Sequence, residues 1–183
     1  SATHEEAWYV DTVKAGRSSW SSIYSWEDQP EIHSVSYNTP LFDGDGRLRG
    51  VIGVDMVINQ LSTWLQQVWG SRDGLVLLIE ADGRLIASSD PSIPLTRTGD
   101  SNERRSLGEL EHPLAEILHG IHQTPEDSSQ PQLLRHEDGA FLLQSTPWGS
   151  DHGLDWILLT ASRASGEITQ AGLILAVEIG AAV

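Results

Sequence analysis

The chain has 183 residues, of which 39% are hydrophobic and seven are Trp, a composition that predicts a folded protein with a sizeable core. Its 11 basic and 26 acidic residues give a net charge of −15, which would repel a phosphate backbone, so we expect no nucleic-acid partner; solubility alone would also account for the acidity. Cysteine is absent, which excludes disulfides, thiol catalysis and Cys-type zinc sites and is compatible with the cytosol or with an exported bacterial domain.

The N-terminal part of the chain predicts one short helix followed by one strand. Residues 7–15 favour a helix, and Gly16 is a typical stop signal after it. Residues 20–26 are rich in aromatic side chains but follow no regular pattern. Residues 31–38 alternate with a period of two, which is typical of a strand with mixed faces.

A hairpin is predicted over residues 40–56. Asp45-Gly46 supplies the residue types that tolerate the positive φ of a tight turn. The returning strand is apolar and contains Gly50 and Gly53, where a bulge or a close backbone approach would explain a missing side chain. It ends at Asp55, a carboxylate among apolar residues, which we expect to be buried and therefore to need a partner.

The hydrophobic period then changes to that of a helix over residues 57–69, which we expect to connect two modules. A second hairpin follows. Its DGRL turn at residues 82–85 repeats the DGRL of residues 45–48, which suggests two related modules divided near residues 69–74.

The second module is predicted to have five strands and one helix. Residues 90–105 are rich in turn formers and are expected to form a long loop, followed by an amphipathic helix over 107–121. The strands are expected at 75–80, 84–88, 132–137, 140–146 and 156–162. Antiparallel hairpins with a helix on one side make an α+β domain.

Two kinds of chemistry find little support in the sequence. His112, Glu116 and His119 share one face of the predicted helix, as zinc ligands would, but a solvated face explains them better, and we expect no metal and no cofactor. No GxSxG motif and no phosphate-binding glycine loop is present, so we expect no catalytic residues.

The residues that follow one another from Trp8-Tyr9 to Asp55 resemble a known family, the extracytoplasmic double Cache sensor domains of bacterial receptors. The family pattern has an aromatic pair, a W..IY segment, a P-hydrophobic-aromatic-D..G.L.GV hairpin and a GVD before a helix. Here these are Trp8-Tyr9, Trp20–Tyr24, Pro40–Val51 and Gly53–Asp55. The resemblance covers about residues 7–165 and is strongest over 8–69.

The resemblance implies an α+β fold of two PAS-like (Cache) subdomains with antiparallel sheets, the first of them incomplete. Residues 1–69 would be the second half of the membrane-distal subdomain with its connecting helix, and residues 70–165 the membrane-proximal subdomain. Residues 166–183 would be a helix leading into a membrane span. The apolar tail from residue 173 is compatible with half of a span or with an amphipathic helix packed on the domain.

The resemblance also implies a small-molecule ligand in the distal subdomain, held by Trp8, Tyr24 and Asp55. The family's arginine, which would pair with a ligand carboxylate, is replaced by Glu6, so an amine fits better than an α-amino acid. From the residues alone, Asp55 has a second interpretation as the N-cap of the following helix, and the two aromatic residues have a second interpretation as ordinary core.

The expected function is therefore a sensor domain without enzymatic activity. It would face the periplasm or the exterior, be anchored in the cell membrane through flanking helices, and form a homodimer in a histidine kinase, chemoreceptor or nucleotide cyclase. The alternatives are a hydrolase-type domain that uses an acidic cleft and a structural spacer whose pocket has degenerated.

Overall fold

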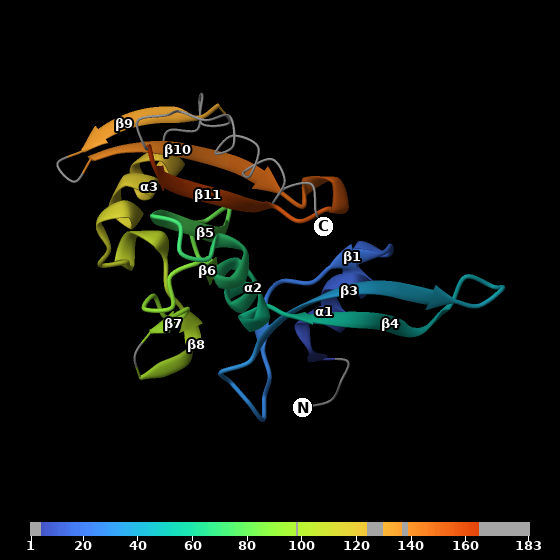
Figure 1. The fold of residues 1–183 in the computed structure, drawn as a ribbon. Helices are drawn as coiled ribbons and strands as arrows, with labels where there is room; N and C mark the ends of the chain where they lie inside the picture. Colours follow the sequence, from blue (N-terminus) through green and yellow to red (C-terminus); the bar gives the residue numbers. More distant parts are fainter. Residues whose placement is uncertain (1–4, 98, 124–129, 137–138, 165–183) are drawn as a thin grey trace. The chain divides into compact units, whose positions relative to one another are not determined.

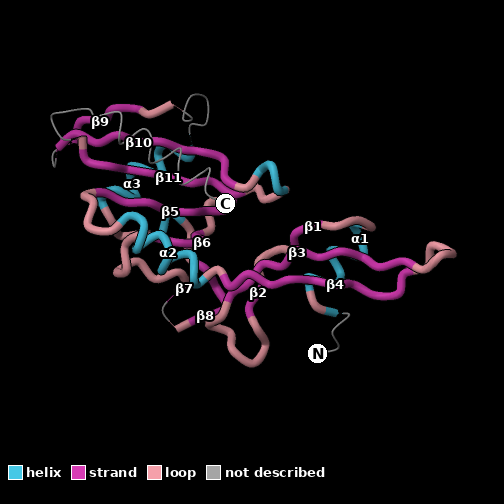
Figure 2. Tube along the Cα trace, turned by 45° about the vertical axis from the view of Figure 1, so that its right-hand side comes forward, coloured by secondary structure: helices cyan, strands magenta, loops and turns pink. Residues whose placement is uncertain are grey.

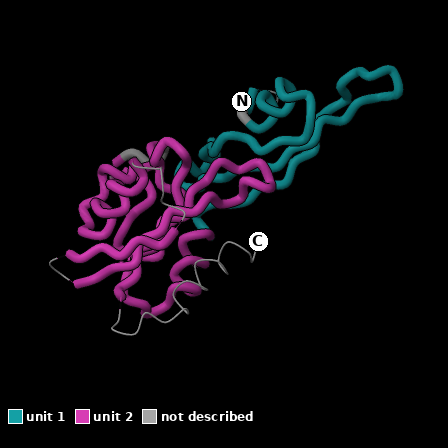
Figure 3. Tube along the Cα trace, turned by 90° about the horizontal axis from the view of Figure 1, so that it is seen from above, with its two compact units in different colours: residues 1–60 teal, residues 61–183 magenta. Residues whose placement is uncertain are grey.

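The computed structural model describes residues 5–97, 99–123, 130–136 and 139–164, and the statements below concern these residues. They divide into two compact units, residues 1–60 and residues 61–183 (Figure 3). The expected helix over 166–183 lies outside the described residues. Within the described part of the chain, no helix combines the length and the apolar character needed to cross a membrane.

In the first unit, β3 (His33–Phe42) lies at the centre of a four-stranded antiparallel sheet (Figure 1). On one edge it pairs with β4 (Leu48–Val57) along nearly its whole length. On its other edge it pairs with two short strands, β1 (Ser19–Trp20) and β2 (Tyr24–Ser25). The aromatic segment that showed no regular pattern thus forms two strand fragments, because β3 supplies the hydrogen-bonding edge that holds them.

The first helix and the first hairpin form as predicted. Helix α1 (Ala7–Ala15) ends at Gly16, whose left-handed backbone (φ 62°) closes the helix with a bond to the Thr12 carbonyl. Gly46 in the β3–β4 turn also has a positive φ of 77°. The Asp43 carboxylate accepts bonds from the backbone N–H groups of Asp45 and Arg47, at 3.1 and 2.9 Å, and so fixes the turn.

The β3–β4 pair presents two faces of different character. Because paired strands place partners on the same face, Ser36 and Asn38 share one face with Asp55 and Gly53. The opposite face carries exposed apolar side chains, namely Tyr37, Leu41, Ile52 and Val54. The apolar character of the returning strand β4 would suggest core residues. Its side chains Ile52 and Val54 are exposed instead.

Helix α2 (Asn59–Trp69) begins where the first unit ends. The Asn59 side chain accepts a bond from the His33 N–H and donates one to the Glu31 carbonyl, both at 3.0 Å. From residue 61 the helix belongs to the second unit, and the Ser62 hydroxyl accepts a bond from the Ser88 N–H at 3.2 Å. The two compact units are divided at Gln60 because most of the helix is held by the second unit.

The second unit is a five-stranded antiparallel sheet in the order β6-β5-β11-β10-β9. The five predicted strands are confirmed as β5 (Gly74–Glu80), β6 (Leu85–Ser88), β9 (Gln132–His136), β10 (Gly139–Trp148) and β11 (Trp156–Arg163). Helix α3 (Pro113–Gln123) lies against this sheet (Figure 2). Its buried Ala115, Leu118 and Ile121 join one core with sheet residues such as Leu77 and Leu159. The predicted α+β class with antiparallel sheets is confirmed.

Two predictions in this unit were wrong. The expected loop over 90–105 contains a two-stranded ribbon of β7 (Thr96–Arg97) and β8 (Asp100–Arg104). The expected helix over 107–121 is divided into a 3₁₀ turn at Leu107–Glu109 and α3. Helix α3 begins at Pro113 because proline lacks the N–H that a helix interior requires but fits the first helical position. A further 3₁₀ turn covers Ser150–His152.

The buried centre of the second sheet should dominate the stability of its unit. Leu159, on the middle strand β11, is 0% exposed, whereas Leu133, on the edge strand β9, is 48% exposed. We expect Leu159→Ala to lower the free energy of unfolding by about 2–5 kcal/mol because it leaves a cavity. Leu133→Ala is the matched control and should cost less than about 1 kcal/mol. Urea denaturation checks both values, and equal losses would contradict the assigned core.

Candidate ligand-binding pocket

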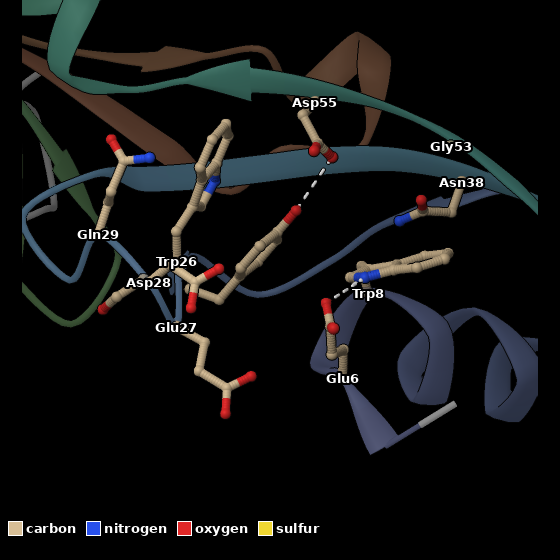
Figure 4. Close-up of a pocket in the computed structure, with 11 residues that line it drawn as sticks. Glu6, Trp8, Trp26, Glu27, Asp28, Gln29, Asn38, Gly53 and Asp55 are labelled. Carbon is tan, nitrogen blue, oxygen red and sulfur yellow. Dashed lines mark hydrogen bonds between the residues drawn. The ribbon is translucent and has the colours of Figure 1, made fainter. Parts of the chain in front are cut away.

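A pocket of about 810 Å³ lies within the first unit, with side chains from the start of α1, from β2 and the loop after it, and from β3 and β4 (Figure 4). All four residues predicted from sequence line it. The full lining set is Glu6, Trp8, Tyr24, Ser25, Trp26, Glu27, Asp28, Gln29, Asn38, Gly53 and Asp55. Residues separated by up to 49 positions in the sequence are brought together because β2 and β4 flank β3.

Asp55 lies near the C-terminal end of β4, opposite Ser36 of β3, and its carboxylate accepts a hydrogen bond from the Tyr24 hydroxyl at 3.0 Å. The expectation that Asp55 is buried was wrong, because its residue is exposed at the open side of the strand. The interpretation as a helix cap was wrong as well. Helix α2 begins at Asn59, and Asp55 sits four residues earlier in regular strand pairing.

Tyr24 donates to Asp55 and is held in its protonated form. Partial burial, the hydrogen bond to Asp55 and the negative charges of Asp55 and Glu6 together raise the pKa of Tyr24 to about 12, although a hydrogen bond with Ser36 acts in the opposite direction. The tyrosine is therefore a fixed donor at neutral pH, and it orients the Asp55 carboxylate.

Both Trp side chains in the pocket are held by their indole N–H groups. Trp8 Nε1 donates to Glu6 Oε2 at 2.8 Å, and Trp26 Nε1 donates to Ser34 Oγ at 2.9 Å. A buried or half-buried indole N–H normally finds such a partner. The consequence is that the flat faces of the two rings, and not their polar edges, are available as pocket walls. Glu6 thus orients an aromatic wall besides adding a charge.

Asn38 forms a polar and fully buried part of the pocket wall. Its Nδ2 donates to the Ser36 carbonyl and hydroxyl, at 3.1 and 2.9 Å, so the amide orientation is set. Ser36 in turn is bonded to Ser21 through backbone and side chain. Asn38 Oδ1 has no hydrogen-bond partner among the described residues. The side chain lies over Gly53, where an added Cβ would come within 2.1 Å of Oδ1.

The electrostatic character of the pocket is uniform. Among its eleven lining residues, all of them described, four carry carboxylates and none is Lys, Arg or His. The carboxylates are Glu6, Glu27, Asp28 and Asp55. Low-dielectric walls concentrate such a field, so the pocket attracts cations and repels anions.

Sequence reasoning missed several pocket residues. Glu27, Asp28 and Gln29 lie in a loop with no pattern, and only the strand pairing on each side brings them to the site. Asn38 carried a signal that could have identified it. It continues the polar alternation of Ser34 and Ser36 in the predicted strand, and a buried polar face is unusual enough to suggest a site.

The histidines of α3 do not form a metal site in the described part of the chain, where no group of three potential ligands comes together. His112 lies at the start of α3 with its Nε2 3.6 Å from an Asp90 carboxylate oxygen. His119 Nε2 pairs with Gln123 at 2.9 Å. Burial, and the nearby His119, lower the pKa of His122, which favours its neutral form.

Residues 1–63 match a family model described as methyl-accepting chemotaxis protein-like, first PDC sensor domain. No curated protein matches the sequence. The resemblance to an extracytoplasmic sensor domain of a receptor is thus supported by an independent match over the residues that line the pocket.

Solved structures with the same fold include three ligand-binding domains. That of Mlp24, solved with asparagine, has a TM-score of 0.57 and 13% identity, and the match covers 97% of this chain and 60% of that chain. That of the Pseudomonas aeruginosa PAO1 amino acid chemoreceptor PctC, in complex with GABA, has a TM-score of 0.57 and 16% identity, with coverages of 88% and 63%. That of the Pseudomonas fluorescens chemoreceptor CtaA, in complex with L-alanine, has a TM-score of 0.57 and 17% identity, with coverages of 91% and 64%. The fold is therefore of the PDC or Cache type, and the chain spans 60 to 64% of the length of these structures.

Tyr24 should ionise at a higher pH than an ordinary tyrosine. Because its pKa is raised to about 12, from an ordinary value of 10, its contribution to stability is fully present below pH 10 and is lost as the pH rises to about 12. A spectrophotometric titration of tyrosinate, compared with that of Tyr24→Phe, should show that the missing transition is the one near pH 12. If the transition missing from the titration of Tyr24→Phe were instead one near pH 10, the result would contradict the Tyr24–Asp55 bond.

Gly53 should be intolerant of any side chain. In Gly53→Ala the new Cβ would meet Asn38 Oδ1 at 2.1 Å, so the amide must move and the buried Ser36–Asn38 network must break. We expect a loss of about 1–3 kcal/mol in the free energy of unfolding. Gly50→Ala, on the same strand, is the control, since its Cβ would meet nothing within 4 Å. Thermal unfolding of both variants checks the contrast, and similar losses would show that Asn38 does not occupy this space.

Proposed function

We propose that the first unit binds a small cationic ligand, an amine or an amino-acid-like compound, and that the chain is part of the sensor domain of a transmembrane receptor. One observation carries this proposal: the pocket combines four carboxylates with three aromatic rings and includes no basic side chain. The family match over residues 1–63 and the shared fold support a sensor.

The pocket suits an ammonium group for two physical reasons. A carboxylate bonded to a charged N–H group makes a stronger hydrogen bond than a neutral acceptor, and the Asp55 carboxylate is already oriented by Tyr24. Trp faces attract cations electrostatically, and the bonds of Trp8 and Trp26 engage the N–H at the ring edge and not the face. The ligand ammonium would lie near Asp55, between rings that are fixed in advance.

The solved structures help to narrow the ligand class. Asparagine, GABA and L-alanine, the compounds in those structures, each carry one ammonium and one carboxylate group. In this pocket Asp55 is available for an ammonium, but no described lining residue is a cation for a carboxylate. Where the family pattern has an arginine, Glu6 bonds to Trp8 instead. Amines without a free carboxylate are therefore the preferred ligands.

A hydrolase is the less favoured function on geometric grounds. General acid–base catalysis needs a partner group whose pKa lies near the working pH. The partner of Asp55 is Tyr24, whose pKa of about 12 keeps it protonated at neutral pH. The pair therefore positions a ligand better than it exchanges protons, and the proposal includes binding without turnover. A spacer with a degenerate pocket would bind no ligand at all.

The cellular location and the assembly of the full receptor are part of the same proposal. The domain would face the periplasm or the exterior and be held in the cell membrane by flanking helices. A homodimer in the full receptor would transmit the ligand signal to a kinase, chemoreceptor or cyclase output. The division of the chain into a distal part, residues 1–69, and a proximal part, residues 70–165, belongs to the same proposal.

Removing the Asp55 charge should weaken amine binding. Since Asp55 does not cap a helix, Asp55→Asn tests the charge without changing the fold. We expect the dissociation constant for putrescine to rise by about tenfold, which corresponds to about 1.4 kcal/mol. Isothermal calorimetry on the 183-residue chain measures it.

The matched control is Asp45→Asn, which removes one charge from the same unit at the exposed β3–β4 turn. It should leave putrescine affinity within about twofold, because screened surface charges act weakly over distance. Equal affinity of Asp55→Asn and the unchanged protein would refute the assigned site. An absence of binding by putrescine, ethanolamine and L-alanine alike would favour the spacer.

A further inference from the structure

We propose that Asn38 is a specificity-determining residue of this pocket: its unpaired Oδ1 accepts an N–H of the ligand, so that primary amines bind in preference to quaternary ammonium ions. The inference rests on the proposed function, since it assigns a further role at the same site. It adds a residue that was not among the four selected from the sequence and the family resemblance.

The first argument is the unused hydrogen-bonding capacity of Asn38. The residue is 0% exposed, and both its donor bonds go to Ser36, so only Oδ1 lacks a partner among the described residues. A buried acceptor without a partner costs about 1–3 kcal/mol, so such groups are rare in native proteins. This one occurs in a pocket wall, where a ligand donor would satisfy it.

The second argument is that the sheet holds this oxygen in place. Asn38 Nδ2 is fixed by two bonds to Ser36, and Ser36 is fixed by Ser21, so the amide cannot turn to exchange its oxygen and nitrogen without losing both bonds. Gly53 leaves the space that the amide occupies. The acceptor is therefore preorganised, which is the usual requirement for selectivity.

The third argument is the position of Asn38 relative to Asp55. Asn38 pairs with Gly53, and Asp55 lies two residues further along the same strand and on the same face. Such diagonal neighbours are about 7–8 Å apart at the backbone, within reach of one group that contacts both side chains. Since Gly53 has no side chain, nothing projects from β4 between them. One ammonium nitrogen can thus donate to Asp55 and to Asn38.

The chemistry then separates two kinds of cation. A primary ammonium has three N–H donors, which is enough for both oxygens, whereas a quaternary ammonium has none. Aromatic rings attract both kinds, so Trp8 does not discriminate strongly between them. Asp55 and Asn38 Oδ1 both accept an N–H and both lose that bond with the quaternary ion, so the share of the preference that belongs to Asn38 is the part that a substitution of Asn38 removes. Oδ1 is covered in this structure, so the atoms packed on it must shift when a ligand N–H reaches it; Figure 4 shows Trp8 and Asn38 at the same end of the pocket.

The test compares ethanolamine with choline, which differ only in the three methyl groups on nitrogen, by calorimetry on the 183-residue chain at pH 7. We expect the unchanged protein to bind ethanolamine about tenfold more tightly than choline. Asn38→Ala should lower the affinity for ethanolamine by about tenfold and leave the affinity for choline within about twofold of its original value. Asn38→Val fills part of the same space without an acceptor, so it should likewise lower the preference for ethanolamine over choline.

Each outcome decides one proposal. The role of Asn38 would be overturned if the unchanged protein bound the two probes with equal affinity, or if Asn38→Ala lost affinity for both probes equally. Neither result would contradict the amine pocket itself. If neither probe binds the unchanged protein, the proposed function falls and this inference with it. Should Asn38→Ala fail to fold, as circular dichroism would show, the preferences of the unchanged protein and of Asn38→Val still decide.

Discussion

The register of the β3–β4 pair is the constraint on which the candidate site depends. Nine partner positions fix this register, with a shift only between Leu41 and Phe42 near the turn. Because side chains alternate along a strand, a slip by one residue would place Asn38 and Asp55 on opposite faces of the sheet. With β3 held by β1 and β2, Asp55 would turn away from the pocket and Val54 would face it instead. The tight turn and the pairing of β3 on its other edge with β1 and β2 oppose such a slip.

A polar wall in the middle of a small sheet is unusual, and hydrogen bonding explains how it is stabilised. Ser34, Ser36 and Asn38 are all fully buried, yet none is an isolated polar group. Ser34 accepts from an indole and Ser36 bonds with both Ser21 and Asn38, so the wall is a network rather than a set of separate contacts. A network with nearly every group paired is rigid, and rigidity is what an oriented acceptor for a ligand requires.

Much of the fold could be predicted from the sequence because its signals are local. The Asp45-Gly46 and Asp82-Gly83 turns, the Gly16 stop and the strands of the second sheet depend on neighbouring residues, and each was found. The short strands β1, β2 and β7, and with β7 the β7–β8 ribbon, could not be predicted, because two-residue strands exist only where a longer strand or a partner segment supplies the bonds.

Part of the candidate site was predicted, and the basis was a family resemblance and not a local sequence signal. Trp8, Tyr24, Asp55 and Glu6 were selected by resemblance to a sensor family, and all four line one pocket. The burial of Asp55 was misjudged, because a run of apolar neighbours was taken for core, while this face of β4 is open. Whether a strand is covered on one face or on both depends on what packs against it, and periodicity alone does not carry that information.

The same acidity that suits the pocket to a cation also acts on the protein itself. Four carboxylates around one cavity repel each other, so the unliganded pocket is a source of electrostatic destabilisation. The bonds from Tyr24 to Asp55 and from Trp8 to Glu6 offset part of this repulsion, but Glu27 and Asp28 lie on a loop. A cation that enters the pocket would relieve the repulsion among all four groups at once. Ligand binding would then change the energetics of the whole wall, from α1 to β4, and that coupling is the physical basis on which a sensor of this design would transmit the presence of its ligand.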